Sequence, residues 1–372
     1  MRFPSDVGAA LPALLVALLV TSALSVYLTP LVRRRAIRLG VVDRPNHRRV
    51  NLRPVPRGGG LAIGISFLIG AIAFLLANAA ARVAGGPTNL EPGQIVALLG
   101  GSAAAVAIGA LDDWFDLRAR WQLIGQLALA AFAIALGIGI VSINNPLGGG
   151  LVTFAAPVSA IITLLWIVGM INSVNFIDGL DGLSSGIGLI AAITLGVLSL
   201  TVQVDQPAVA VLCFALAGSL AGFLRWNFHP ATVFPGSSGT TFVGFALAIL
   251  SILGSAKVAV ALLVLGVPII DAFWIIVRRL WARRSPFQPD RGHLHHRLLD
   301  LGLSHRQTVV LIYAICTGLG VLSLILSGAN QVYAFVGVFV GIGLLLLFIA
   351  GDGFGDAALE ADSYAEQDTG GG

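Results

Sequence analysis

Long runs of hydrophobic residues, separated by short polar segments, recur along the whole chain. A helix needs about 20 mostly apolar residues to cross a bilayer. The first run, near residues 7–28, is too long for the hydrophobic part of a signal peptide and is interpreted as a membrane helix. The pattern predicts eleven membrane helices, at residues 7–29, 59–81, 93–111, 121–141, 152–171, 186–203, 207–224, 239–254, 257–277, 307–327 and 331–350.

The amino-acid composition supports the same interpretation. Of the 372 residues, 57% are hydrophobic and 11% are charged, and the mean hydropathy is +0.92. A soluble domain is nearer about 25% charged, so we expect an all-α polytopic protein in a lipid bilayer, with no nucleic-acid partner. Cys213 and Cys316 both lie in apolar runs, which argues against a structural disulfide or a Cys-based metal site.

The basic residues predict how the chain is oriented in the membrane. One alternating set of loops holds 19 of the 22 Arg and Lys residues, and the other set keeps only Arg2, Arg82 and Lys257. By the positive-inside rule the first set is cytoplasmic, which places the N-terminus outside and the C-terminus inside. We expect a membrane domain over residues 1–350 and a disordered, acidic and Gly-rich cytoplasmic tail at 351–372.

Polar residues are unusually concentrated in that same set of loops. Basic cytoplasmic loops collect polar residues in many membrane proteins, but this alternative does not explain the acidic residues found here. The clusters are 43–60, 112–120, 172–186, 225–240 and 286–305. Ionisable groups at a membrane boundary are costly and indicate function by default. We therefore expect these loops to converge on one site.

Two of the clusters are acidic. Asp112, Asp113 and Asp116 end the third run, where Asp112 and Asp116 would share a helix face and either bind a divalent cation or supply a base; a solvated helix end is the alternative. Oxygen ligands without Cys or His favour Mg²⁺ or Mn²⁺ over zinc. Asn175, Asp178 and Asp181 offer such oxygens and are spaced three apart, so they would share one face of a helix. The alternative is that these residues cap the helix that follows.

A third cluster is rich in histidine. His293, His295 and His296 lie between Arg291 and Arg297, with no carboxylate or Cys nearby in sequence to complete a zinc tetrahedron. Arg forks and imidazole N–H groups suit a diphosphate better. The alternative is a basic loop that touches anionic lipid headgroups.

Two further features have less specific patterns. A stiff basic loop contains Arg49 and Arg57 and ends in Gly58-Gly59-Gly60; it either holds a phosphate or only sets topology. Asp271 lies inside the ninth run, seven residues before Arg278, and is interpreted as a buried structural pair with it rather than as part of the site.

Five segments, in this order, resemble one family of membrane enzymes. They are DRPNHRRVNLRPVPRGGG, GALDDWFDL, NSVNFIDGLDGLSSG, GFLRWNFHPATVFPGSSGT and DRGHLHHRLLDLG. The chain resembles the polyprenyl-phosphate N-acetylhexosamine-1-phosphate transferases, glycosyltransferase family 4, from about Asp43 to Gly302. The His-x-His-His form is similar to the branch that transfers simple N-acetylhexosamine phosphates. The branch with a muramyl-pentapeptide donor usually carries a different histidine cluster.

The resemblance implies roles for individual residues. It makes Asp112, Asp113, Asp178 and Asp181 catalytic, and Asn175 a metal ligand. Phe234 would stack on the uracil of the nucleotide sugar. The other residues implied to bind this substrate are Arg291, His293, His295, His296, Arg49, Asn51 and Arg57.

The chain also departs from the family pattern. Ser237 stands where the second metal carboxylate belongs, and a neutral hydroxyl is a weak Mg²⁺ ligand. Arg49 and Asn51 occupy the places of a usual Lys and His, and Gln122 that of a common Lys.

The resemblance implies a Mg²⁺- or Mn²⁺-dependent transfer of N-acetylglucosamine-1-phosphate, or a related sugar phosphate, from a UDP-N-acetylhexosamine to undecaprenyl phosphate. The enzyme would lie in the inner (plasma) membrane with its active site facing the cytoplasm, and would start a cell-envelope polysaccharide. A homodimer stays open. So do three alternatives: a muramyl-pentapeptide transferase, a transporter, and a weakened family member that binds lipid or nucleotide without turnover.

Overall fold

The computed structural model describes residues 3–4, 7–43, 54–84, 89–145, 150–253, 257–281, 293–326 and 329–351. Within these ranges the chain is mainly helical, with two antiparallel two-stranded ladders, β1–β2 and β3–β4. The strands are β1 (Val42–Asp43), β2 (Val55–Pro56), β3 (Ser142–Asn144) and β4 (Leu151–Thr153). The helices are α1 (Val7–Arg38), α2 (Gly60–Ala81), α3 (Pro92–Phe115), α4 (Ala119–Ala135), α5 (Ala156–Phe176), α6 (Leu183–Ser199), α7 (Pro207–Asn227), α8 (Gly236–Ile252), α9 (Lys257–Val264), α10 (Gly266–Trp281), α11 (Leu294–Asp300), α12 (His305–Ile325) and α13 (Ala329–Gly351).

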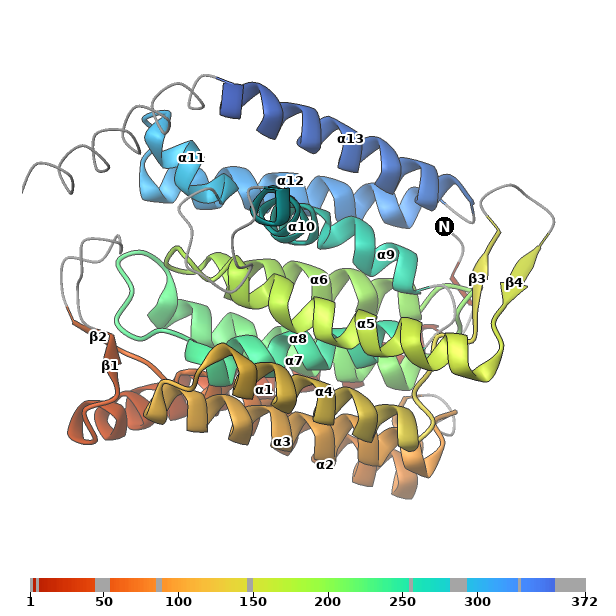
Figure 1. The fold of residues 1–372 in the computed structure, drawn as a ribbon. Coiled ribbons are helices and arrows are strands. Elements are labelled where there is room, and N and C mark those ends of the chain that lie inside the picture. Colours follow the sequence, from red (N-terminus) through yellow and green to blue (C-terminus); the bar gives the residue numbers. More distant parts are fainter. Residues whose placement is uncertain are drawn as a thin grey trace, which may run out of the picture.

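The helices lie side by side in layers (Figure 1). Helices α1 to α4 form one side of the bundle, α12 and α13 the other, and α5 to α8 lie between them. One end of the bundle carries α11 and the β1–β2 ladder, and the opposite end carries the β3–β4 hairpin (Figure 1). The chain runs back and forth between these ends, so segments far apart in sequence meet at the α11 end.

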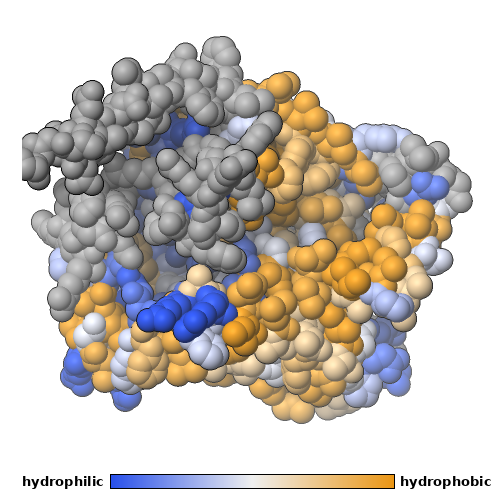
Figure 2. All heavy atoms as spheres, viewed as in Figure 1, coloured by the Kyte–Doolittle hydropathy of each residue, from blue (hydrophilic) through white to orange (hydrophobic). Residues whose placement is uncertain are grey.

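The described helices fit a chain that crosses a membrane several times. Six of them, α1, α2, α3, α5, α7 and α12, are long and apolar enough to cross a bilayer, and α9 and α10 make a seventh if this pair, bent by 76°, is one span. Figure 2 shows hydrophobic residues spread over the sides of the bundle. The prediction of a helical, multi-pass membrane protein is confirmed, while the count of eleven crossings and their orientation stay predictions.

Several boundaries differ from the predicted ones for physical reasons. Helix α1 continues past residue 29 to Arg38, because arginine is a good helix former and is favoured in a last helical turn. Residues 151–153 pair as β4 instead of starting α5, which begins beside Pro157 and ends at Phe176. The ninth predicted helix is broken between α9 and α10, shortly before Pro268.

Close packing places α7 and α8 in the core of the bundle. Gly218 and Gly222 let α7 approach α1, since an added Cβ would lie 2.2 Å from the Leu18 carbonyl oxygen and 2.3 Å from that of Ser22. Phe223, Phe242 and Phe245 are fully buried around these helices. Helices α7 and α8 are therefore packed tightly against their neighbours.

Candidate active site

The first turn of α8 is bound to the last turn of α3 through one carboxylate. Asp113 accepts the N–H groups of Ser237 at 2.7 Å and Ser238 at 3.0 Å, and the Ser238 hydroxyl at 2.7 Å. The free N–H groups and the dipole of a helix start favour such an anion. Gly236 has a φ of +68°, and a Cβ there would lie 2.4 Å from Asp113 Oδ1, so this turn requires glycine.

A second bond joins the beginning of α8 to α5. The Thr240 hydroxyl, one turn after Gly236, donates to Asn175 Oδ1 at 3.1 Å. Asn175 lies in the last turn of α5, while Asp178 and Asp181 follow in the connection to α6. The three therefore do not share a helix face. Nor do the acids cap α6, because its N-cap is Gly182, without a side-chain cap.

Asp112 is oriented by two bonds to one of its oxygens. Its Oδ1 accepts the Leu117 N–H and the Gln122 side-chain N–H, both at 2.9 Å. Gln122, which stands in the place of a common lysine, thus orients the carboxylate of Asp112 by a hydrogen bond. Asp116 does not share a helix face with Asp112: it is the C-cap of α3 with a left-handed φ of 51°, and its carboxylate lies 3.6 Å from Arg57.

The connection between α5 and α6 carries two carboxylates in different settings. Asp178 accepts the Ser184 hydroxyl. Burial, reinforced by the nearby charges of Asp113 and Asp181, raises the pKa of Asp178 to about 8. Asp181 is buried, and its Oδ2 lies 2.7 Å from His229 Nδ1 and accepts the Ala231 N–H at 3.0 Å.

The histidine segment contacts this acidic connection directly. His295 is 2% exposed, and a Cβ at Gly179, between Asp178 and Asp181, would lie 2.2 Å from its Nε2. Burial, together with the neighbouring histidines, lowers the pKa of His295 well below its usual value, so the ring is neutral. His293 and His296 lie next to it, with ring centroids 5.5 and 4.4 Å from that of His295.

The basic first loop reaches the same end of the bundle. Phe234 donates its N–H to the Pro56 carbonyl and accepts the Gly59 N–H, both at 2.9 Å. Arg57 is bonded to the buried Asp43, at 2.9 Å through Nε. Arg49, Asn51 and Arg291 lie outside the described residues.

Comparisons with known proteins agree with this arrangement. Residues 95–255 match the family described as Glycosyl transferase family 4. A Bacillus subtilis (strain 168) protein named probable undecaprenyl-phosphate N-acetylglucosaminyl 1-phosphate transferase is 33% identical over 326 residues, covering 85% of this chain and 86% of the relative. The chain belongs to glycosyl transferase family 4.

Other members of family 4 align over similar lengths. The decaprenyl-phosphate N-acetylglucosaminephosphotransferase of Mycolicibacterium smegmatis is 35% identical, covering 93% of this chain and 91% of the relative. The undecaprenyl-phosphate alpha-N-acetylglucosaminyl 1-phosphate transferase of Escherichia coli (strain K12) is 28% identical, covering 78% of each chain. Membership in a transferase family argues against the transporter alternative.

In this family 4 chain, the structure brings most of the predicted site residues to one end of the bundle. They are Asp112, Asp113, Asn175, Asp178, Asp181, Phe234, Ser237, His293, His295 and His296, with Arg57 nearby at Asp43 and Asp116. Their catalytic, binding and metal roles stay predictions.

Three further residues belong to this end and were not predicted. Asp271 does not act only as a structural pair, because its carboxylate binds His293 Nδ1 at 2.7 Å and the Leu294 N–H at 2.8 Å. His229 and His305 stack with ring centroids 4.2 Å apart beside Asp181. Both histidines lie in polar clusters of the sequence, which was the available signal.

The oxygen donors at this end suit magnesium. Asp113 binds the first turn of α8, which includes Ser237, and Asn175 binds Thr240 in the turn that follows. Burial and the charges of Asp113 and Asp181 raise the pKa of Asp178. Crowded carboxylates of this kind are relieved by a divalent cation, and a set of oxygens is the preference of Mg²⁺.

Proposed function

We propose that this family 4 transferase moves N-acetylglucosamine-1-phosphate from UDP-N-acetylglucosamine to undecaprenyl phosphate and releases UMP. One observation carries the proposal: acids from α3 and the α5–α6 connection meet the histidines of α11 at one end of the bundle. The names and coverage of the similar proteins support the same sugar phosphate and lipid.

The reaction would exchange one phosphorus–oxygen bond for another. An oxygen of the lipid phosphate forms a bond to the β-phosphorus of the donor. The bond from that phosphorus to the UMP oxygen breaks, and its electron pair leaves with UMP. Because its Oδ1 is fixed by Leu117 and Gln122, Asp112 is placed to orient or deprotonate the lipid phosphate.

The histidine segment would bind the transferred phosphate. A neutral His295 carries one N–H and can donate it to a phosphate oxygen without bringing a positive charge, and His293 and His296 flank it. Arg291 would add a charged fork, and Phe234 would stack on the uracil. Asn175, Ser237 and Asp113 would hold a Mg²⁺ ion, which when bound supplies positive charge to neutralise the diphosphate.

We place this end of the bundle at the cytoplasmic face of the plasma membrane. The Arg and Lys residues gather in its loops, and UDP-sugars are made in the cytoplasm. The lipid chain would stay among the helices, so that only its phosphate reaches the site.

The test is a transfer assay with detergent-purified protein, undecaprenyl phosphate and labelled UDP-N-acetylglucosamine. We expect a labelled lipid product and stoichiometric UMP, with at least about a hundredfold loss in Asp112→Asn. UDP-N-acetylmuramoyl-pentapeptide serves as the comparison donor. A preference for that donor would assign the chain to the muramyl-pentapeptide branch, and undiminished transfer by Asp112→Asn would remove Asp112 from the chemistry.

A further inference from the structure

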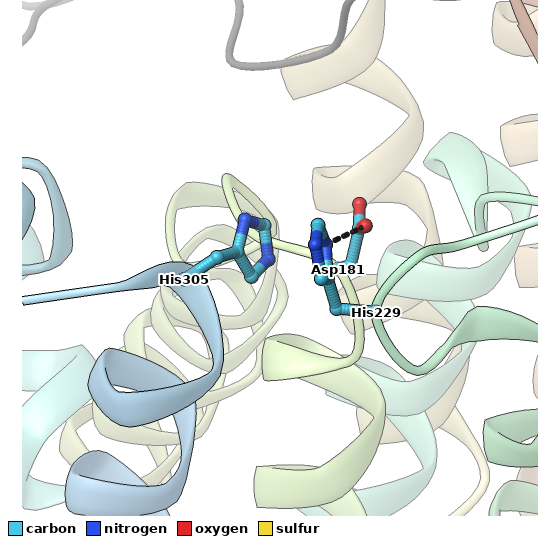
Figure 3. Close-up of side chains that lie close together, drawn as sticks. All are labelled: Asp181, His229 and His305. Carbon is cyan, nitrogen blue, oxygen red and sulfur yellow. Dashed lines mark hydrogen bonds and ion pairs between the residues drawn. The ribbon is translucent and has the colours of Figure 1, made fainter.

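Three side chains from three separate connections meet beside the proposed active site. Asp181 lies between α5 and α6, His229 lies between α7 and α8, and His305 is the first residue of α12 (Figure 3). Each offers one potential ligand atom, and these atoms all lie within 4.8 Å of one another. None of these contacts is local in sequence, so the fold builds the cluster.

The carboxylate and one imidazole of this cluster are already fixed in position. Asp181 Oδ2 lies 2.7 Å from His229 Nδ1 and accepts the Ala231 N–H at 3.0 Å. Figure 3 shows the His229 ring between the carboxylate and His305. Asp181 is thus held by the Ala231 backbone and His229 is held by Asp181, so two of the three ligands are already oriented toward each other.

The second imidazole is poorly satisfied by the described residues. Both ring nitrogens of His305 are shielded from solvent and make no hydrogen bond of regular geometry with those residues, although the Asp181 backbone lies close enough to interact with the ring. Its ring instead stacks on His229 at an interplanar angle of 23°. Leaving a buried polar group unpaired costs roughly 1–3 kcal/mol, and a missing ion is one common reason for such a group.

The donor set identifies the class of ion. Two imidazoles and one carboxylate are ligands of Zn²⁺ and related transition metals, with a fourth position open to water. Mg²⁺ prefers oxygen ligands only, as offered by Asp113 and Asn175. The Arg306 guanidinium donates to the His229 carbonyl oxygen at 3.1 Å, and this nearby positive charge makes the site weaker than a closed four-ligand zinc site.

We propose that Asp181, His229 and His305 bind one transition-metal ion of the Zn²⁺ class. The ion would fasten the start of α12 to the two loops that line the α11 end. The Tyr313 hydroxyl already joins α12 to the Gly182 carbonyl oxygen, so the ion would add a second attachment to the same loop. The proposal does not depend on the transfer reaction, because binding is measured without substrate.

The test is metal binding by the full chain in detergent with the affinity tag removed. Co²⁺ is the probe, since tetrahedral Co²⁺ absorbs visible light. We expect one Co²⁺ per chain, displaced by Zn²⁺ and unaffected by a hundredfold excess of Mg²⁺. Affinity should fall at least tenfold in His229→Gln and in His305→Gln. His296→Gln, at a described histidine of α11 that does not belong to the cluster, is the matched control and should bind Co²⁺ normally.

A second measurement needs no variant. Diethyl pyrocarbonate labels accessible histidines, and mass spectrometry of peptides locates the label. Zn²⁺ should protect His229 and leave the labelling of His296 unchanged. The proposal is overturned if the unmodified chain retains no Zn²⁺ or Co²⁺, if both cluster variants bind as well as the control, or if Zn²⁺ protects His229 and His296 equally.

Discussion

His293 Nδ1 lies 2.7 Å from the carboxylate of Asp271, a buried residue of α10. The other oxygen of Asp271 accepts the Leu294 N–H at 2.8 Å, at the first residue of α11. A single carboxylate thus fixes both the ring of the first histidine and the start of the helix that carries the other two. This makes Asp271 a positioning residue for the histidine segment.

Asp271→Asn should impair donor binding, because an amide can replace only one of these two acceptors. Hydrogen bonds to a charged group contribute about 1.5–3 kcal/mol, so we expect a KM for the UDP-sugar raised by roughly tenfold or more. The measurement is transfer at varied donor concentration. Asp300→Asn, at an exposed acid of α11, is the control, and equal KM values for the two variants would contradict the positioning role.

Asp113→Asn should lower stability more than Asp112→Asn. Asp113 makes three bonds to the start of α8, whereas an Asn amide oxygen at position 112 can still accept both bonds to Oδ1. We expect a loss of about 1–3 kcal/mol for Asp113→Asn. Thermal unfolding in detergent checks it, and equal melting temperatures for the two variants would show that Asp113 does not anchor α8.

Gly179→Ala should displace His295, since the new Cβ would lie 2.2 Å from Nε2. A shift of about 1 Å in a catalytic group can lower a rate by roughly a hundredfold. The assay is transfer at saturating donor. Gly318→Ala is the matched control, because a Cβ there meets nothing within 4 Å. Full activity in Gly179→Ala would mean that His295 does not need its present position.

The apolar runs and the polar residues between them allowed much of this to be predicted. Bilayer thickness fixes helix length, so the predicted runs found their helices, and Asp112 and Asn175 stood out as polar groups beside apolar segments. The partners of those residues could not be predicted in the same way. Asp181 and His229 are 48 residues apart, and only the tertiary fold shows that they meet.

Two misses have local causes. Asp271 was left out of the predicted site because it lies inside an apolar run, but α10 places its carboxylate against the start of α11. Arg38 was assigned to a loop because charge was taken as a sign of exposure, whereas α1 simply continues beyond its apolar part. Charge predicts where a membrane span ends better than where a helix ends.

Asp178 should make stability depend on pH. The pKa of Asp178 is about 8 in the fold and near 3.8 when unfolded. Between these values only the unfolded chain loses the proton, so the stabilisation is complete below about pH 4 and is lost as the pH rises through about 8. Thermal unfolding across this range should show a melting temperature that falls with pH, and less steeply in Asp178→Asn.

The control for this pH series is Asp205→Asn, at an exposed acid in the connection between α6 and α7. It should keep the slope of the unmodified protein. If Asp178→Asn also keeps that slope, the Asp178 carboxyl is ionised in the fold at neutral pH.

Ser237→Asp tests whether the absence of the family's usual second metal-binding carboxylate weakens Mg²⁺ binding in this chain. The Ser237 N–H already donates to Asp113 Oδ1 at 2.7 Å, so the new acid would lie beside an existing one. Like charges this close repel unless a cation lies between them. Without metal the variant should therefore melt at a lower temperature than Ser237→Asn, the neutral control of the same size, and Mg²⁺ should remove that difference. In the transfer assay, Ser237→Asp should reach half-maximal activity at a roughly tenfold lower Mg²⁺ concentration, equivalent to about 1.4 kcal/mol in the free energy of Mg²⁺ binding. The maximal rate should change little. A rise in maximal rate from near zero would instead show that the native chain is a weakened member of its family, because the missing ligand would then limit the chemistry and not only the affinity for the ion.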